Sequence, residues 1–306
     1  MLLSGITLLA ITCCVGCGDD AKSLQKSSPD RPIVFASTYD ESHGEIYLVT
    51  APGNPPTRLT NDTDANFHPV LSPDGHKVAY VTQGSDLHEN IWVMLLDDAG
   101  TVIANYPLTN DSFRNITPCW SPDITTVMFA RLSDDPQSGL PAGIYEQAMT
   151  SDTAELLVGD DARNPAYSPT DPSTIAFSRE ENDVENFYTA QRSSTDIVTQ
   201  VTTFTDPSLV LHGIAWSPDG MRLAFCDLSG NGNGRIYVVL ASGGTATAIT
   251  SVDNDSGGPS WIDNATIAYF ANSGDGAHSL YSILATGGTP TVLLSNFGDI
   301  TRSHNR

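Results

Sequence analysis

The residues of this chain that could do chemistry gather at one recurring place, a few positions before a repeated Ser-Pro turn or its equivalent. They are Asn66, His68, Arg114, Arg163, His212, Asp255 and Asp299. Imidazoles, guanidinium groups and carboxylates in such a mixture could bind a small anion, a divalent metal or the side chains of a partner. The alternative is that they are solvated loop residues that pair with one another in salt bridges.

Known catalytic and metal-binding motifs are missing from the sequence. It has no G-x-S-x-G elbow, no H-E-x-x-H, no P-loop and no G-x-G-x-x-G after a strand. No two histidines have a close metal-ligand spacing, and no loop has the carboxylates of a calcium site. The sequence therefore predicts no metal and no cofactor. It favours a non-catalytic role and leaves an enzymatic one open.

The candidate residues are positioned by a repeat. Its equivalent points are Ser72, Ser121, Ser168, Ser217 and Ile262, at spacings of 49, 47, 49 and 45 residues. A period in the forties built from short strands is typical of a four-stranded propeller blade. The Ser and Asp of the turn are not a catalytic pair in this interpretation, because a single site could not use every copy.

One unit of the repeat shows the expected strands. They are 212–217, 222–227, 235–241 and 245–250, separated by Pro-Asp-Gly, a Gly-Asn-rich loop and Gly-Gly. Val, Ile, Tyr, Phe and Ala alternate along them, as in strands packed between neighbouring sheets. No segment after residue 20 has a helical period, so helix should be nearly absent.

The order Trp-Ser-Pro-Asp-Gly, Ile-Tyr, Gly-Gly and Leu-Thr resembles the PD40 repeat of TolB-like, WD40-like propellers. The resemblance covers roughly residues 33–304 and implies an all-β, six-bladed β-propeller. The turn departs from the pattern at Ile124, which replaces glycine. The seven candidate residues would then surround the mouth of the central channel.

The two ends of the predicted propeller fit together. Residues 32–37 read as a second strand whose own first strand is missing. Near the C-terminus, Ile300-Thr301 aligns with Ile116-Thr117 of a first strand. We therefore expect the C-terminus to supply the missing inner strand and to close a ring of six blades without an open edge.

The N-terminus reads as an export signal. Residues 1–16 are largely apolar, and Cys14-Val15-Gly16-Cys17 resembles the lipobox of bacterial lipoproteins, in which Cys17 would be lipidated. The stretch lacks Lys and Arg, and Cys14 stands where an aliphatic residue is usual, so an ordinary secretory signal is the alternative. The predicted domains are a signal over 1–17, a polar tether over 18–31 and the propeller over 32–306.

Charge limits the partners. The formal net charge is −22, which opposes binding to nucleic acid and leaves the lipid as the membrane contact. The sequence predicts a monomeric, lipid-anchored module on the periplasmic or outer-membrane side of the cell envelope, which binds a protein or peptide. The alternative is a propeller enzyme or sugar-binding protein similar to uronate lyases. In it, His68, Arg114, Arg163 and His212 would act on a small anionic or sugar ligand.

Overall fold

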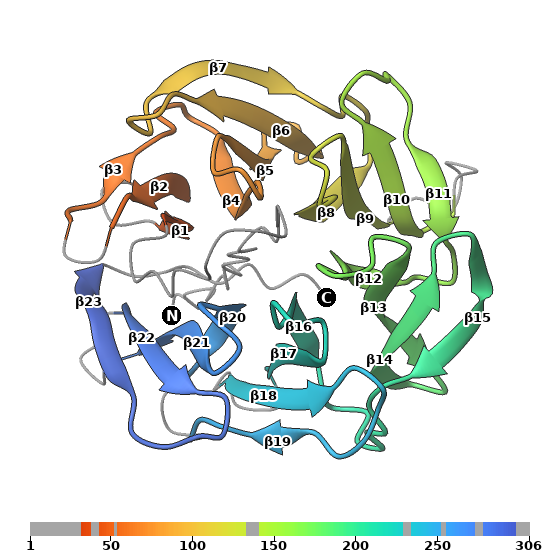
Figure 1. Cartoon of the computed structure of the whole chain (residues 1–306). Helices are drawn as coiled ribbons and strands as arrows, with labels where there is room; N and C mark the ends of the chain where they lie inside the picture. Colours follow the sequence, from red (N-terminus) through yellow and green to blue (C-terminus); the bar gives the residue numbers. More distant parts are fainter. Residues whose placement is uncertain are drawn as a thin grey trace, which may run out of the picture.

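The computed structural model describes residues 32–37, 43–51, 54–132, 141–228, 234–251, 255–272 and 278–297. Every regular element in these ranges is a β-strand, as the hydrophobic alternation predicts. The strands follow one another as antiparallel meanders, which Figure 1 shows arranged in a ring. The architecture is therefore all-β. The segment expected to close the ring, residues 298–306, lies outside the described residues.

The first half of the ring holds three meanders. Meander 1 consists of β1 (Ile33–Ser37), β2 (Glu45–Val49) and β3 (Thr57–Arg58). Meander 2 consists of β4 (Ala65–Leu71), β5 (Lys77–Gln83), β6 (Glu89–Leu96) and β7 (Val102–Pro107). Meander 3 consists of β8 (Arg114–Trp120), β9 (Thr126–Leu132), β10 (Gly143–Ala148) and β11 (Glu155–Val158). A single parallel pair, Glu89 with Arg114, joins meanders 2 and 3 into one sheet.

The second half holds three meanders of four strands each. Meander 4 consists of β12 (Arg163–Tyr167), β13 (Thr174–Glu181), β14 (Val184–Gln191) and β15 (Ser194–Gln200). Meander 5 consists of β16 (Leu211–Trp216), β17 (Arg222–Asp227), β18 (Arg235–Leu240) and β19 (Thr247–Ala248). Meander 6 consists of β20 (Gly257–Trp261), β21 (Thr266–Asn272), β22 (His278–Leu284) and β23 (Thr291–Phe297). The first strand of each faces the centre of the ring in Figure 1.

A cross-strand aromatic pair sets the register of every meander. The directly opposed residues are Phe35 and Tyr47, Tyr80 and Trp92, Phe129 and Tyr145, Phe177 and Tyr188, Phe225 and Tyr237, and Tyr269 and Tyr281. Such pairs stabilise antiparallel strands beyond the area that they bury. In five of the meanders the second and third strands supply this pair. In meander 1 the strands β1 and β2 supply it, so β1 occupies the position of a second strand.

Tryptophans connect neighbouring meanders. Trp120 Nε1 donates to the Val70 carbonyl at 3.1 Å, and Trp261 Nε1 donates to that of Ala215 at 3.1 Å. Trp216 makes the same bond to Ala166 at 3.3 Å. Each bond joins an inner strand to the inner strand of the preceding meander.

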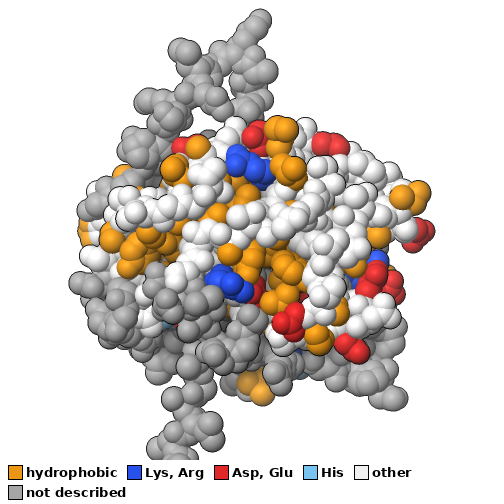
Figure 2. Space-filling view, turned by 90° about the horizontal axis from the view of Figure 1, so that it is seen from below, with side chains coloured by type: hydrophobic (Ala, Val, Ile, Leu, Met, Phe, Trp, Pro, Cys, Tyr) orange, Lys and Arg blue, Asp and Glu red, His pale blue; other side chains and the backbone are white. Residues whose placement is uncertain are grey.

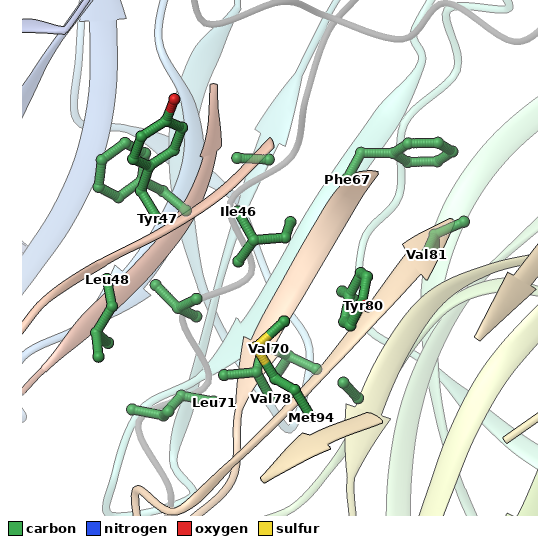
Figure 3. Close-up of a cluster of buried hydrophobic side chains, with 14 of the residues drawn as sticks. Ile46, Tyr47, Leu48, Phe67, Val70, Leu71, Val78, Tyr80, Val81 and Met94 are labelled. Carbon is green, nitrogen blue, oxygen red and sulfur yellow. The ribbon is translucent and has the colours of Figure 1, made fainter. Parts of the chain in front are cut away.

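The hydrophobic core lies between meanders. Figure 3 shows the cluster between meanders 1 and 2, where Ile46 and Leu48 of β2 approach Val70 and Val78 of the next sheet. Meanders 1 and 6 also touch, because the rings of Phe35 and Phe270 lie 6.0 Å apart. The first and last described meanders are therefore packed against each other.

The side chains of the repeated sequence signatures form hydrogen bonds that stabilise turns and strands. Ser72 donates its hydroxyl proton to Asp74 at 2.5 Å and accepts the Lys77 amide at 2.9 Å, which closes the Ser-Pro-Asp turn. The same bonds recur in meanders 3 and 5. The Thr of the Leu-Thr, Val-Thr or Ile-Thr signature accepts the amide of the Ile or Phe that precedes the third-strand aromatic residue of the pair, or that of β2 in meander 1. These residues are Thr60, Thr109, Thr202 and Thr250, and each Oγ1 lies 2.8 to 2.9 Å from the amide nitrogen. These motifs therefore hold the fold and leave other positions for function.

Candidate functional site

Each inner strand of meanders 2 to 6 is interrupted by a β-bulge. The register with the second strand shifts after Phe67, Ile116, Arg163, His212 and Gly257. The residue that follows adopts a left-handed backbone conformation. These residues are His68, Thr117 and Asn164 at φ 50°, Gly213 at φ 60° and Gly258 at φ 59°. They occupy the same place in each repeat, and we call them the bulge layer.

The residue type conflicts with the backbone of the bulge layer at Thr117, whereas His68 and Asn164 are of types that tolerate a left-handed conformation. A left-handed conformation is costless for glycine but strained for a side chain branched at Cβ, such as that of Thr117. Meanders 5 and 6 supply glycine, whereas meanders 2 and 3 supply His68 and Thr117. Bulges and strained residues of this kind concentrate at functional sites because they re-aim side chains.

His68 is the most perturbed group in the layer. Its side chain packs edge-on against Phe67, with ring centroids 5.1 Å apart, and the residue is only 6% exposed. Burial, together with the smaller electrostatic effect of His212, lowers the pKa of His68 to about 3. The imidazole is therefore neutral near pH 7. Its Nδ1 atom is buried and has no hydrogen-bond partner among the described residues.

Thr117, the bulge residue of the next meander, has the same deficit. Its Oγ1 is buried without a partner among the described residues. Asn164, by contrast, donates to Ser178 Oγ at 3.0 Å and to the Leu211 carbonyl at 2.9 Å. Buried polar atoms are normally hydrogen-bonded, and leaving one unpaired costs about 1–3 kcal/mol. Two adjacent meanders thus present unused hydrogen-bonding capacity at equivalent positions.

His212 enters the same environment from the opposite side of the ring. It lies on β16, which faces β4 across the centre in Figure 1, and its charge acts on His68. Next to it, Glu185 accepts the amide of Leu211 at 2.7 Å. Burial raises the pKa of Glu185, and the charge of Arg163 opposes this shift. Arg163 is exposed.

Other predicted site residues serve local structure. Asn66 is fully buried, donates to Asp62 Oδ1 at 2.9 Å and accepts from Thr82 Oγ1 at 2.8 Å. Arg114 donates from Nε to Glu89 at 2.8 Å, across the pair that joins meanders 2 and 3. Both residues remain predictions as ligand contacts, but their described bonds are to the protein itself.

The last two predicted residues stand apart from the bulge layer. Asp255 accepts the Gly234 amide at 3.0 Å and lies 4.0 Å from His278 Nε2. Asp299 lies outside the described residues. The structure thus places His212 within electrostatic reach of His68 and distributes Asn66, Arg114 and Asp255 among separate polar networks.

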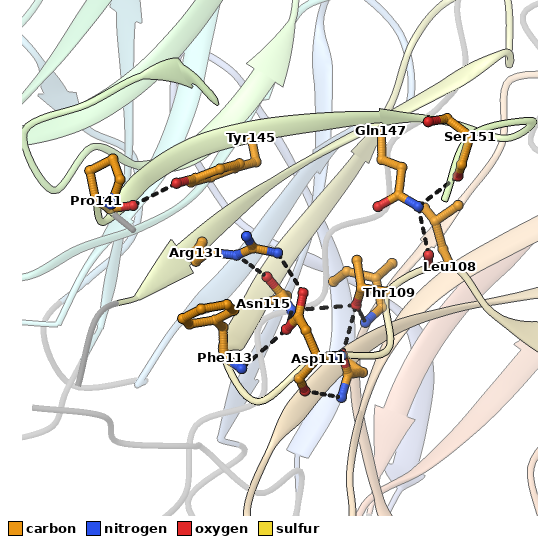
Figure 4. Close-up of polar contacts among 12 residues, drawn as sticks. Leu108, Thr109, Asp111, Phe113, Asn115, Arg131, Pro141, Tyr145, Gln147 and Ser151 are labelled. Atoms are coloured by element: carbon orange, nitrogen blue, oxygen red, sulfur yellow. Dashed lines mark hydrogen bonds and ion pairs between the residues drawn. The ribbon is translucent and has the colours of Figure 1, made fainter. Parts of the chain in front are cut away.

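Sequence reasoning missed two residues near this site, Thr117 and Arg131. Thr117 could have been found by aligning the position four residues before each Ser-Pro, where His68 also stands. Arg131 donates to Asn115 Oδ1 at 2.8 Å and to Asp111 Oδ2 at 2.6 Å. Its guanidinium lies 4.7 Å from the ring centre of Phe113. Figure 4 shows Arg131, Asn115 and Asp111 with the bonds between them. This network fixes the loop that enters meander 3.

The described residues contain no group of three His, Cys, Asp or Glu side chains placed to hold a metal ion. Cys119 and Cys226 are buried in separate core clusters. Within the same ranges, no helix is long and apolar enough to cross a bilayer.

Comparison with solved structures identifies the fold. TolB from Acinetobacter baumannii superposes with a TM-score of 0.71 at 18% identity, covering 89% of this chain and 65% of that one. The fold is that of the TolB β-propeller. A proposed TolB of Agrobacterium tumefaciens follows at 0.64 and 16% identity, covering 81% and 87%. The propeller domain of the Trilobed protease from Pyrococcus furiosus gives 0.53 at 12% identity, covering 90% and 84%.

Sequence comparison adds little to this TolB-like propeller. No family model matches the chain. An uncharacterised protein of Agrobacterium fabrum is 28% identical over 102 residues, which cover 31% of this chain and 35% of that protein. The chain thus spans 65% of the Acinetobacter TolB and about a third of the curated relative. These likenesses establish the fold, and activity and partners are matters for proposal.

Proposed function

We propose that this protein is a lipid-anchored β-propeller of the cell envelope that binds a protein or peptide at the bulge layer without chemical conversion. The observation that carries the proposal is that two buried polar atoms, His68 Nδ1 and Thr117 Oγ1, have no partner among the described residues and lie at equivalent positions on left-handed backbone. A neutral imidazole and a hydroxyl suit a polar side chain or a backbone amide of a partner. The TolB-like fold supports a role in protein interaction.

Partner capture from cells tests this function. The full-length, tagged protein is crosslinked in the cell, purified and analysed by mass spectrometry. Thr117→Val removes the hydroxyl and keeps the branched shape, whereas Thr125→Val makes the same change at an exposed turn. We expect a stoichiometric envelope protein that is lost with Thr117→Val and retained with Thr125→Val. A partner retained by both variants contradicts the site, and no partner at all favours the small-ligand or sugar alternative.

The closed form of the propeller is part of the proposal. We infer six blades, the first of which gains its inner strand from the C-terminal segment. The second-strand position of β1 and the contact of Phe35 with Phe270 support this arrangement. Deleting residues 298–306 should therefore lower the midpoint of thermal unfolding strongly. A truncated protein that melts with the full-length chain contradicts the closure.

The anchor is proposed from the sequence alone. Cys17 would carry the lipid after cleavage of residues 1–16, and residues 18–31 would connect it to the propeller on the periplasmic or outer-membrane side. Metabolic labelling with a fatty-acid analogue should mark the wild type and leave Cys17→Ser unlabelled. Equal labelling of both proteins rejects Cys17 as the lipidation site.

A further inference from the structure

The two rims of the ring differ in character, and one of them has an unusual sector. The turn rim carries the Ser-Pro-Asp turns and the turns between third and fourth strands. Immediately before the second strand, meanders 2 to 4 place polar residues there, namely His76, Thr125 and Ser173. Meanders 5 and 6 place Met221 and Ala265 at the same point, and Met221 is 64% exposed.

The ends of the third strands extend this apolar surface. Leu240 closes β18 opposite Arg222, and Leu284 closes β22 opposite Thr266, so the two leucines are equivalent. They are 53% and 55% exposed. The corresponding residue of meander 4 is the polar Gln191. We call Met221, Leu240 and Leu284 the apolar sector.

Backbone contacts hold the apolar sector together. Ala241, which follows Leu240, donates its amide to the Met221 carbonyl at 2.9 Å. Asn264 of meander 6 accepts the Asp219 amide of meander 5 at 2.9 Å. The turns of the two meanders are therefore fastened to each other. Figure 2 views the molecule from the side of β18, β19 and β22, where hydrophobic side chains form a band and acidic ones stand mostly toward its margins.

The turns of meanders 5 and 6 on the turn rim contain few charged residues, although the protein as a whole is acidic. The turns 241–246 and 285–290 contain no charged residue, whereas the equivalent turn of meander 2 contains Asp97 and Asp98. The acids that remain, Asp219 and Asp263, accept turn amides from Met221 at 3.0 Å and from Ala265 at 2.7 Å. In a chain with a net charge of −22, the sector therefore has two turns without charge and retains only these two acids in its other turns.

The N-terminal segment joins the propeller at this same rim. Ile33, the first residue of β1, pairs with Val49, just as Leu223 pairs with Val239 near the start of the second strand of meander 5. The chain therefore enters β1 at the turn rim of meander 1, whose neighbour is meander 6. The tether proposed from the sequence, residues 18–31, can reach at most roughly 50 Å. A lipid on Cys17 would hold the turn rim near the bilayer.

We propose that the apolar sector rests on a lipid bilayer and orients the propeller, with its turn rim toward the membrane and the opposite rim toward its partner. The inference relies on the proposed lipid anchor. Three apolar side chains make a weak contact alone, but a short tether gives an effective concentration in the millimolar range. The absence of charge in the turns 241–246 and 285–290 reduces the repulsion that the rest of this acidic surface would meet at a membrane, and Asp219 and Asp263 are the acids that remain beside them.

Environment-sensitive probes test the orientation. The lipidated, full-length protein is reconstituted on phosphatidylcholine vesicles after Leu240→Cys or Leu284→Cys is labelled with a fluorophore. Leu87→Cys is the matched control, because Leu87 is 69% exposed and lies in the loop between β5 and β6, on the opposite rim. Spin-labelled lipids quench the fluorophore only where it touches the bilayer. We expect quenching at positions 240 and 284 to exceed that at 87 several-fold.

The outcomes separate the orientation from the anchor. Vesicle-bound protein with equal quenching at 240, 284 and 87 overturns the orientation and leaves the anchor intact. A second result would also overturn the orientation and leave the anchor intact. In it, quenching at positions 240 and 284 is low, and the protein forms a dimer that the double variant Leu240→Ser, Leu284→Ser dissociates. The apolar sector would then be the contact between two copies of the chain. Protein that fails to bind vesicles, or that binds unchanged as Cys17→Ser, contradicts the anchor. If the protein fails to bind vesicles, the proposed orientation is contradicted together with the anchor. If Cys17→Ser binds unchanged, the comparison of quenching at positions 240, 284 and 87 still tests the orientation.

Discussion

Meanders 2 and 3 have the same backbone features as meanders 5 and 6 but differ from them in side chains at two places, the bulge layer and the turn rim. All four carry the aromatic pair, the inner-strand bulge and a turn stabilised by its own side chains. At the bulge, the first two place His68 and Thr117, and the last two place Gly213 and Gly258. At the turn rim, immediately before the second strand, the first two place His76 and Thr125, and the last two place Met221 and Ala265. The shared features hold the fold, so the differences are where recognition can be specific.

The largest expected loss of stability is the same in meanders 2 and 3 as in meanders 5 and 6. Trp120→Ala and Trp261→Ala each remove a buried ring and the bond that joins two inner strands. Each should lower the free energy of unfolding by about 3–5 kcal/mol, as large-to-small core substitutions do. Urea denaturation measures both. If one variant lost less than about 1 kcal/mol, the two halves would not share a scaffold.

The free energy of unfolding should depend on pH through meander 2, because among these four meanders it alone has a titratable group, His68, in the bulge layer. The pKa of His68 is lowered from 6.5 to about 3, so the native state keeps the imidazole neutral while the unfolded chain protonates it. Stability due to this group is complete above pH 6.5 and declines as pH falls, by up to about 1.4 kcal/mol per pH unit. Denaturation from pH about 6.5 to about 5 should show this slope.

The control for the pH experiment is His68→Asn, which tolerates the left-handed conformation and has no proton to take up. Its unfolding free energy should change less with pH than that of the wild type over the same interval. Identical slopes for the two proteins would show that the imidazole is not buried in its neutral form.

Backbone strain should give opposite signs in the two halves. Thr117→Gly removes a branched side chain from φ 50° and should stabilise the protein by about 1 kcal/mol. Gly213→Ala introduces a side chain at φ 60° and should destabilise it by about as much. Thermal unfolding of both variants measures the difference. Two changes of the same sign would mean that the bulges are not equivalent.

The smallest effect belongs to the apolar sector. Leu284→Ser should change the unfolding free energy by no more than about 0.5 kcal/mol, because the side chain is already in solvent. Ile283→Ser, one residue earlier, should cost several times as much, since Ile283 is buried. Equal costs would place Leu284 in the core and remove it from the proposed membrane contact.

Much of the scaffold could be predicted from local sequence. The predicted strand 222–227 matches β17 (Arg222–Asp227), because alternating residues between a turn and a loop leave little freedom of register. The expected strand 245–250 shortens to Thr247–Ala248, because Thr250 instead accepts the amide of Ile236. Ile124 adopts φ 56° and so keeps the conformation that glycine has in the related turns, although its type argues against it.

The candidate site was less predictable. The sequence marks where His68 and His212 occur, but the bulge depends on pairing with a neighbouring strand and has no signature of its own in His, Thr or Asn. For the same reason, Asn66 and Arg114 resemble site residues in the sequence although their bonds are to Asp62 and Glu89. Distinguishing a paired side chain from an unpaired one requires the positions of its neighbours.

The tryptophan bonds between inner strands also make the protein its own optical reporter. Trp120, Trp216 and Trp261 each emit from an indole tied to the carbonyl of the preceding meander. A partner that wedges two meanders apart would release one of these indoles and shift its emission to longer wavelength, whereas a partner that leaves the ring intact would not. The native fluorescence of the unlabelled protein can therefore distinguish rigid docking from opening of the ring.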